Sequence, residues 1–133
     1  MKIEHINPSG LAEPTGYSHV VATSGGRTLY LAGQGAYDAD SKLVGAGDHE
    51  AQTRQAFRNL VTALESAGGG PENIVFCTIY VVRLDDAALG AFIRGMNDAL
   101  DGQPMPPCAS TMVGIERLAY EEMLVEINAI AVV

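Results

Sequence analysis

The chain has 133 residues, of which 47% are hydrophobic and only 18% are charged, and its formal net charge is −8. This length fits a single domain, residues 1–133, with a core of its own. The acidic balance and the scattered lysines and arginines argue against binding to nucleic acid, because that affinity rests on clustered basic side chains.

The few cysteines and histidines also exclude several kinds of site. Two cysteines, Cys77 and Cys108, are too few for a disulfide scaffold, and no Cys or His spacing is typical of a metal site. We therefore expect no metal and no cofactor. Since the sequence has no apolar signal segment and no run of membrane-spanning length, we expect a cytoplasmic protein without a membrane partner.

The N-terminal part of the chain is predicted to form strands at residues 2–6, 18–23 and 28–34. Gly25 and Gly26 lie between the last two strands and are typical of a hairpin connection. Gly33 lies near the end of the third strand, where a glycine either ends the strand or lets a ligand approach the backbone.

Two helices and three further strands follow. Asp48 is a predicted N-cap, and apolar residues at helical spacing predict a helix over residues 49–67. Residues 73–82 are apolar on both faces, which is typical of a central strand in which Cys77 is a small core residue. Asp85 or Asp86 caps a second helix, and the final two strands are predicted at residues 109–115 and 123–133.

The order β-β-β-α-β-α-β-β predicts an α+β domain in which both helices cover one face of a mixed sheet. The other face of the sheet is also apolar and has no partner within the chain. The low share of charged residues, against about 25% in a typical domain, points the same way. Both observations predict a homo-oligomer.

Glu126 is the best candidate for site chemistry. In a strand over residues 123–133 every second side chain shares a face, and Glu126 and Asn128 lie among apolar neighbours on one face. Burying an unpaired carboxylate costs several kcal/mol, roughly, so such a residue needs partners or a wet cleft. The alternatives are that Glu126 forms a structural ion pair or faces solvent on a half-exposed strand.

Several motifs in sequence order resemble the RidA/YjgF/UK114 family of small trimeric proteins. The matching segments span nearly the whole chain and include Gly16-Tyr17-Ser18-His19, Leu29-Tyr30-Leu31-Ala32-Gly33-Gln34, Asn73-Ile74-Val75 and Val125-Glu126-Ile127-Asn128-Ala129-Ile130-Ala131-Val132. The resemblance implies a chorismate-mutase-like fold. It also implies a homotrimer with an inner barrel, helices outside, and three clefts between neighbouring subunits.

The resemblance further implies an activity, because active members of that family hydrolyse reactive enamines and imines such as 2-aminoacrylate to a 2-oxo acid and ammonia. Three positions carry over. Tyr17 matches the tyrosine near the cleft, and Gly33 matches the glycine whose backbone borders the substrate. Glu126 matches the carboxylate that positions the hydrolytic water.

The family's substrate-binding arginine does not carry over, since its position holds Ser110 or, in a second alignment, Ala109. A charge-assisted hydrogen bond contributes about 1.5–3 kcal/mol, so imines of the 2-aminoacrylate type are expected to bind poorly. The hydroxyls of Ser110 and Thr111 suit a carbonyl, amide or hydroxyl instead. The alternative is that both are simply strand residues near an emptied site.

The leading hypothesis is therefore a hydrolase of imine or enamine deaminase type, acting on a small metabolite in an intersubunit cleft, with Glu126 catalytic. Tyr17, Gly33, Ser110 and Thr111 would bind the substrate. The alternative is a non-catalytic trimer that binds small metabolites or partners another enzyme. Ribonuclease activity, an older label for some relatives, is disfavoured by the acidic composition, and no motif places a histidine beside Cys108 to make it a nucleophile.

Overall fold

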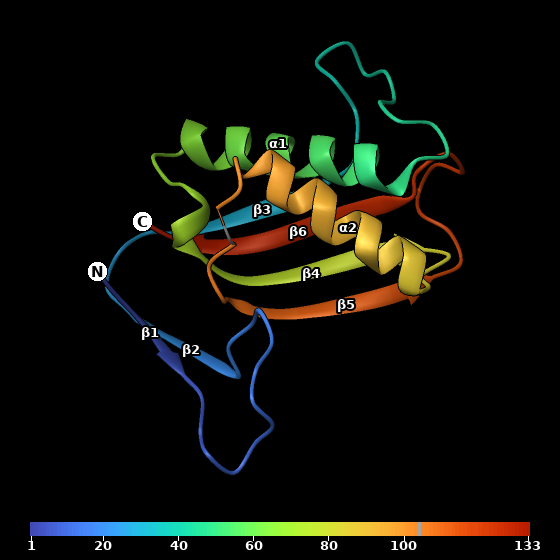
Figure 1. Cartoon of the computed structure of the whole chain (residues 1–133). Coiled ribbons are helices and arrows are strands. Elements are labelled where there is room, and N and C mark those ends of the chain that lie inside the picture. The colour runs from blue at the N-terminus through green and yellow to red at the C-terminus, as the bar shows by residue number, and fades with distance from the viewer. Residues whose placement is uncertain (104) are drawn as a thin grey trace.

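The chain folds into a layer of two helices on a four-stranded sheet, with a two-stranded arm beside it (Figure 1). The computed structural model describes residues 1–103 and 105–133. Within those residues the elements are β1 (Lys2–Ile6), β2 (Val20–Ser24), β3 (Thr28–Gln34), α1 (His49–Ser66), a 3-10 turn η1 (Pro71–Asn73), β4 (Ile74–Val82), α2 (Asp86–Ala99), β5 (Ala109–Ile115) and β6 (Val125–Val132).

The larger sheet is mixed and has the strand order β3-β6-β4-β5. β4 and β5 are parallel and are joined through α2, whereas β6 pairs antiparallel with both β3 and β4. Both helices lie on one face of this sheet (Figure 1). The predicted α+β class, the mixed sheet and the position of the helices are confirmed.

The helices begin where the sequence predicts, because each has an aspartate cap. The Asp48 carboxylate accepts a hydrogen bond of 3.0 Å from the Ala51 N–H, and Asp85 accepts one of 2.8 Å from the Ala88 N–H. The helices pack closely where α2 has Gly95, since a Cβ there would lie 2.5 Å from the Glu50 carbonyl oxygen. Among the described residues, no helix combines the length and the hydropathy that a membrane crossing requires.

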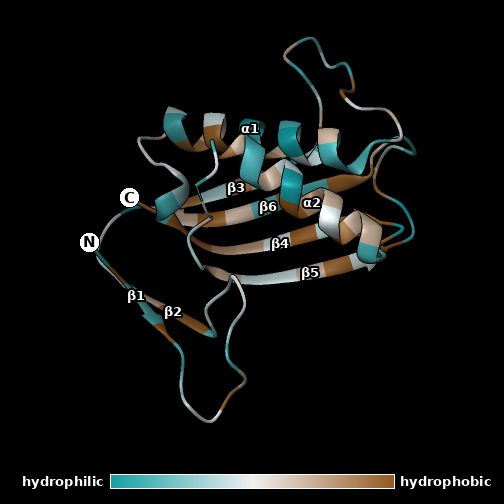
Figure 2. Cartoon of the chain, in the orientation of Figure 1, coloured by the Kyte–Doolittle hydropathy of each residue, from teal (hydrophilic) through white to brown (hydrophobic). Residues whose placement is uncertain are grey.

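The core lies between the helices and the sheet. Phe57 and Leu60 of α1 are fully buried there, as are Val125 and Ile127 of β6. Figure 2 shows hydrophilic residues on the outward side of α1 and hydrophobic residues along much of β4 and β6. The predicted alternation of β6 is confirmed: Val125, Ile127, Ala129 and Ala131 are buried, and Glu126 and Asn128 lie on the face without helices.

The predicted hairpin between the second and third strands is wrong. β2 pairs with β1 in the arm, while β3 pairs with β6. The reason is burial: Leu29 and Leu31 of β3 alternate toward the core beside Ala131 and Ala129 of β6, which stabilises β3 in the larger sheet.

The helix-free face of the four-stranded sheet, hereafter the open face, carries exposed apolar side chains. Tyr30 of β3 is 80% exposed and Phe76 of β4 is 41% exposed, and both are in register with Ile130 of β6. This is the apolar face without an intrachain partner that the sequence predicts.

Candidate functional site

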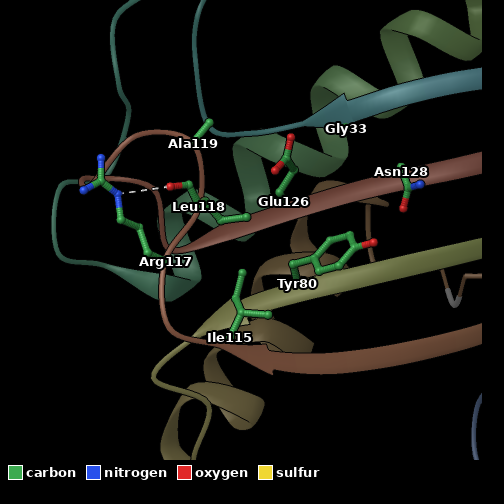
Figure 3. Close-up of a pocket in the computed structure, with 8 residues that line it drawn as sticks. All are labelled: Gly33, Tyr80, Ile115, Arg117, Leu118, Ala119, Glu126 and Asn128. Carbon is green, nitrogen blue, oxygen red and sulfur yellow. Dashed lines mark hydrogen bonds between the residues drawn. The ribbon is translucent and has the colours of Figure 1, made fainter.

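Glu126 lies in a pocket on the open face. The pocket has a volume of about 520 Å³ and is lined by Gly33, Tyr80, Ile115, Arg117, Leu118, Ala119, Glu126 and Asn128 (Figure 3). β6 supplies Glu126 and Asn128, β4 supplies Tyr80, and β3 supplies Gly33. The remaining residues come from the end of β5 and the connection to β6.

Strand register brings the polar side chains of the pocket together. Tyr80 of β4 lies directly opposite Glu126, and Thr78 lies opposite Asn128. Because alternate residues of a strand share a face, Glu126 and Asn128 point to the same side. The pocket therefore combines a carboxylate, an amide and a phenol along adjacent strands.

Gly33 is adjacent to Glu126 in space. A Cβ at position 33 would overlap the Oε1 atom of Glu126 and would lie 2.7 Å from its Cδ. The pairing of β3 with β6 is irregular between Leu31 and Gln34, so the backbone of β3 deviates from the regular ladder here. The absence of a side chain at Gly33 therefore leaves room for the carboxylate, as well as exposing the backbone to a ligand.

The carboxylate of Glu126 is half-buried, and the hydrogen bonds and ion pairs found among the described residues include none to it. Asn128 is in a similar state: its Oδ1 is buried and has no hydrogen-bond partner in the described structure. An unsatisfied buried acceptor costs about 1–3 kcal/mol. Two acceptors without protein partners thus line one pocket, where a water or a ligand N–H or O–H would satisfy them.

Arg117 and Tyr80 line the pocket but are not among the residues that the sequence predicts for the site. The Arg117 Nε donates to the Leu118 carbonyl oxygen at 3.3 Å. Its guanidinium points away from Glu126 at the edge of the pocket (Figure 3). Arg117 belongs to an irregular connection, where no periodicity predicts the direction of a side chain. The sequence places Tyr80 in a predicted strand, but only the register opposite Glu126 shows that its side chain lies on the open face of the sheet.

Tyr17 and Ser110 lie in a second pocket, hereafter the thiol pocket, on the helix side of the sheet. It has a volume of about 650 Å³ and is enclosed by α2, β4, β5 and residues 15–17. The register explains why Ser110 faces this side: it lies opposite Cys77, whose side chain is buried in the core. Apolar side chains and the two cysteines line most of this pocket.

Thr111 lines neither pocket. It is exposed on the open face, opposite Thr78, which in turn lies opposite Asn128. Within one chain, the structure therefore brings together Glu126 and Gly33, places Tyr17 with Ser110 elsewhere, and leaves Thr111 on the open face of the edge strand β5. Among the described residues, no group of three His, Cys, Asp or Glu side chains could hold a metal ion.

Comparison with known proteins supplies the family. The profile of the family described as Endoribonuclease L-PSP matches residues 9–133. A RutC family protein from Synechocystis sp. is 33% identical over 134 residues, which cover 99% of this chain and 98% of that protein.

Solved structures agree with this match over the whole fold. YyfB of Yersinia pestis, a Rid family protein of unknown function, is 38% identical, with a TM-score of 0.88 and full coverage of both chains. RidA from an Antarctic Psychrobacter is 25% identical, with a TM-score of 0.65 and coverage of 92% of each chain.

Proposed function

The chain belongs to the Endoribonuclease L-PSP family of RidA/YjgF-type proteins, and on this premise we propose that it hydrolyses small imines or enamines in the pocket of Glu126. The observation that carries the proposal is the pair of unpartnered acceptors in that pocket. Among the described residues the Glu126 carboxylate is a base without a hydrogen-bond or ion-pair partner, and the Asn128 Oδ1 is an acceptor suited to an N–H group.

The proposed reaction needs one well-placed base. Glu126 accepts a hydrogen bond from a water and takes its proton as the water oxygen bonds to the imine carbon. The electron pair of the C=N bond moves to nitrogen, which takes the proton from Glu126. The Glu126 carboxylate then takes the hydroxyl proton of the resulting carbinolamine and passes it to nitrogen as the C–N bond breaks, so that imine and water give a carbonyl compound and ammonia. Asn128 and the backbone at Gly33 hold the substrate during these steps.

We propose that the substrate lacks a free carboxylate. Neither Ala109 nor Ser110 supplies a guanidinium, and the guanidinium of Arg117 points away from Glu126 at the pocket edge (Figure 3). A substrate carboxylate placed beside Glu126 would meet a like charge without the cation that offsets it. Like charges at close range oppose binding, and a charge-assisted hydrogen bond that is missing forfeits about 1.5–3 kcal/mol.

The proposed assembly is a homotrimer in which open faces pack around an inner barrel. Exposed Tyr30 and Phe76 support it, because burying this apolar face removes it from water. The pocket of Glu126 would then open onto the seam between two copies. In that arrangement Thr111 of the proposed substrate-binding set faces the seam from the open face, whereas Tyr17 and Ser110 lie in the second pocket, on the helix side of the sheet.

The test is ammonia release from imines generated in solution by an oxidase. An amine oxidase supplies neutral imines, and an amino-acid oxidase supplies imines with a carboxylate. The protein should accelerate ammonia release from the neutral imines at least about tenfold more than from the imines with a carboxylate. A tenfold ratio corresponds to a difference of about 1.4 kcal/mol in the stabilisation of the two transition states. Equal acceleration of both would refute the proposed substrate class, and no acceleration of either would refute the proposed hydrolase.

A second candidate function is binding of a small metabolite without turnover. It is favoured by the separation of Tyr17 and Ser110 from Glu126 within one chain, which leaves few groups to hold a substrate. A thermal-shift screen against carbonyl compounds and amines distinguishes the two. Stabilisation by a compound whose imine is not hydrolysed supports binding alone.

A further inference from the structure

Two buried thiols meet at the inner wall of the thiol pocket. Cys77 of β4 is fully buried and Cys108, directly before β5, is 2% exposed. Their Sγ atoms are 3.6 Å apart and share a hydrogen bond. Both residues line the pocket. The proposed imine chemistry on the opposite face of the sheet uses neither thiol.

The two thiols differ in character. The hydrogen bond from the Cys77 thiol lowers the pKa of Cys108, whereas the same bond, together with burial, raises the pKa of Cys77. The thiolate is the nucleophilic form of cysteine. Cys108 is therefore suited to attack an oxidant, and Cys77 lies within reach to react with the product.

The bond that would form requires movement of the backbone as well as of the two side chains, because Cys108 lies two residues before Ser110, the register partner of Cys77. A disulfide has a sulfur–sulfur distance of about 2.05 Å, so the sulfurs must approach by roughly 1.5 Å. Cys77 is held in the middle of β4, between two neighbouring strands. Cys108 precedes the first residue of β5, so it lies outside the β4–β5 ladder and can move toward Cys77.

We propose that Cys77 and Cys108 form a reversible disulfide, with a small neutral peroxide that enters through the thiol pocket as the oxidant. The Cys108 thiolate attacks one peroxide oxygen; a sulfur–oxygen bond forms, the oxygen–oxygen bond breaks, and hydroxide leaves. The Cys77 sulfur then attacks the Cys108 sulfenic acid, which forms the disulfide and releases the second oxygen as water. In total, two thiols lose two electrons and two protons, and hydrogen peroxide becomes two waters.

This disulfide would act on the arm formed by β1 and β2. The Cys108 carbonyl oxygen accepts a hydrogen bond of 3.1 Å from the Ser18 N–H, and the adjacent Pro107 carbonyl oxygen accepts one from the Ser18 hydroxyl. His5 Nδ1 lies 3.1 Å from the same Pro107 oxygen. Movement of Cys108 toward Cys77 thus shifts the point at which the arm is attached, and it also reshapes the pocket that holds Tyr17 and Ser110.

The test is treatment of the folded protein with one equivalent of hydrogen peroxide. The chain has only these two cysteines, so an intramolecular disulfide in it can only be this pair. We expect loss of both free thiols, a mass lower by two hydrogen atoms, a cross-linked peptide containing both cysteines, and full reversal by dithiothreitol. In Cys77→Ala the reaction should stop at a sulfenic acid on Cys108. Cys108→Ala should react with hydrogen peroxide more slowly than both the wild-type protein and Cys77→Ala.

Two outcomes would overturn the proposal. In the first, the folded protein keeps both thiols under conditions that oxidise the urea-unfolded chain. In the second, oxidation yields disulfides between chains or a sulfinic acid on one cysteine. Because the wild-type protein itself is the test sample, loss of folding in a variant cannot obscure either result.

Discussion

At the scale of the single residue, the fit between Gly33 and Glu126 determines what the open-face pocket can do. The carboxylate occupies space that any side chain at position 33 would take. The position of the carboxylate therefore depends on a residue of another strand. A change at Gly33 should act on the chemistry of Glu126 without removing the carboxylate itself.

Gly33→Ala should displace the Glu126 carboxylate and reduce ammonia release by about 10²-fold or more, the scale of a lost general base. The thermal midpoint should change little, because Gly33 is exposed and the atom it would meet ends a flexible side chain. Gly10→Ala is the matched control, since a Cβ at Gly10 has no heavy atom within 4 Å. Unchanged activity in Gly33→Ala would contradict the proposed role of this contact.

Tyr37 supplies a prediction for high pH. Its hydroxyl donates to Glu122 Oε1 at 2.8 Å, and desolvation together with this carboxylate raises its pKa to about 12. In an unfolded chain the phenol ionises near pH 10, roughly. The stabilisation from this proton is therefore complete below about pH 10 and is lost as the pH rises toward about 12.

The measurement is the free energy of unfolding in urea at about pH 9 and about pH 11. The loss of stability between the two should be smaller in Tyr37→Phe than in the wild-type protein, because the variant has no phenol to ionise at this position. An equal loss in both would show that the Tyr37 proton does not contribute.

The residues of the site differ in how well the sequence predicts them. Glu126 and Asn128 follow from alternation in a strand whose other face is entirely apolar. Ser110 and Thr111 follow from an alignment, which gives their positions in the sequence but not the face of the sheet on which each side chain lies. Because they are adjacent residues of β5, their side chains lie on opposite faces of the sheet, and only one of them can face the pocket of Glu126. Arg117 has neither a periodic pattern nor an aligned motif, so only coordinates place it in the pocket.

At the scale of the element, α1 holds both loops that border the pocket. The fully buried Gln52 donates to the carbonyl oxygens of Gly45 and Glu122, each at 3.1 Å, and accepts from the Leu124 N–H at 2.8 Å. Two helical turns further along α1, the Asn59 side chain donates to the carbonyl oxygens of Gly35 and Tyr37. A single helix thereby fixes the backbone next to Glu126 and next to Gly33.

Gln52→Met should lower the free energy of unfolding by roughly 2–4 kcal/mol, because it keeps the volume but removes three hydrogen bonds and leaves the buried Leu124 N–H without its acceptor. Gln55→Met is the control: within the described part of the chain the Gln55 side chain donates to the Asn59 side chain alone, so its loss should cost less than about 1 kcal/mol. Urea denaturation measures both. Equal effects of the two substitutions would contradict the anchoring role of Gln52.

Most elements follow from the sequence, but one pairing does not. Both helices follow from apolar spacing and aspartate caps, and β4 and β6 follow from long apolar patterns. The error concerns β2 and β3, where glycines between two short strands are typical of a hairpin. The competing partner of β3 lies about a hundred residues away in β6, and no local signal reports the burial gained from that pairing.

At the scale of the whole molecule, the open face exposes apolar side chains that a partner surface would remove from water. Tyr30, Ile130 and Phe76 form an apolar row across three strands, beside the pocket of Glu126. Contiguous apolar surface of this kind is typical of protein–protein contacts. The proposed trimer buries this row, so its assembly and the environment of Glu126 are linked.

Tyr30→Asp should shift the protein from trimer to monomer, because a buried carboxylate without a partner opposes association. Its fold should persist, since Tyr30 is 80% exposed in the single chain. Tyr120→Asp is the control: Tyr120 is 64% exposed but lies outside the sheet. Sedimentation velocity measures the mass of both variants, and a trimeric Tyr30→Asp would contradict assembly through the open face.

The most direct test of the central claim is the rate of ammonia release from a neutral imine by the wild-type protein and by Glu126→Gln, with Glu122→Gln as the control. Glu126→Gln keeps the shape of the pocket and removes only the base, so we predict a loss of about 10²–10⁴-fold, with Glu122→Gln retaining wild-type activity. A Glu126→Gln variant that releases ammonia as fast as the wild-type protein would contradict the account.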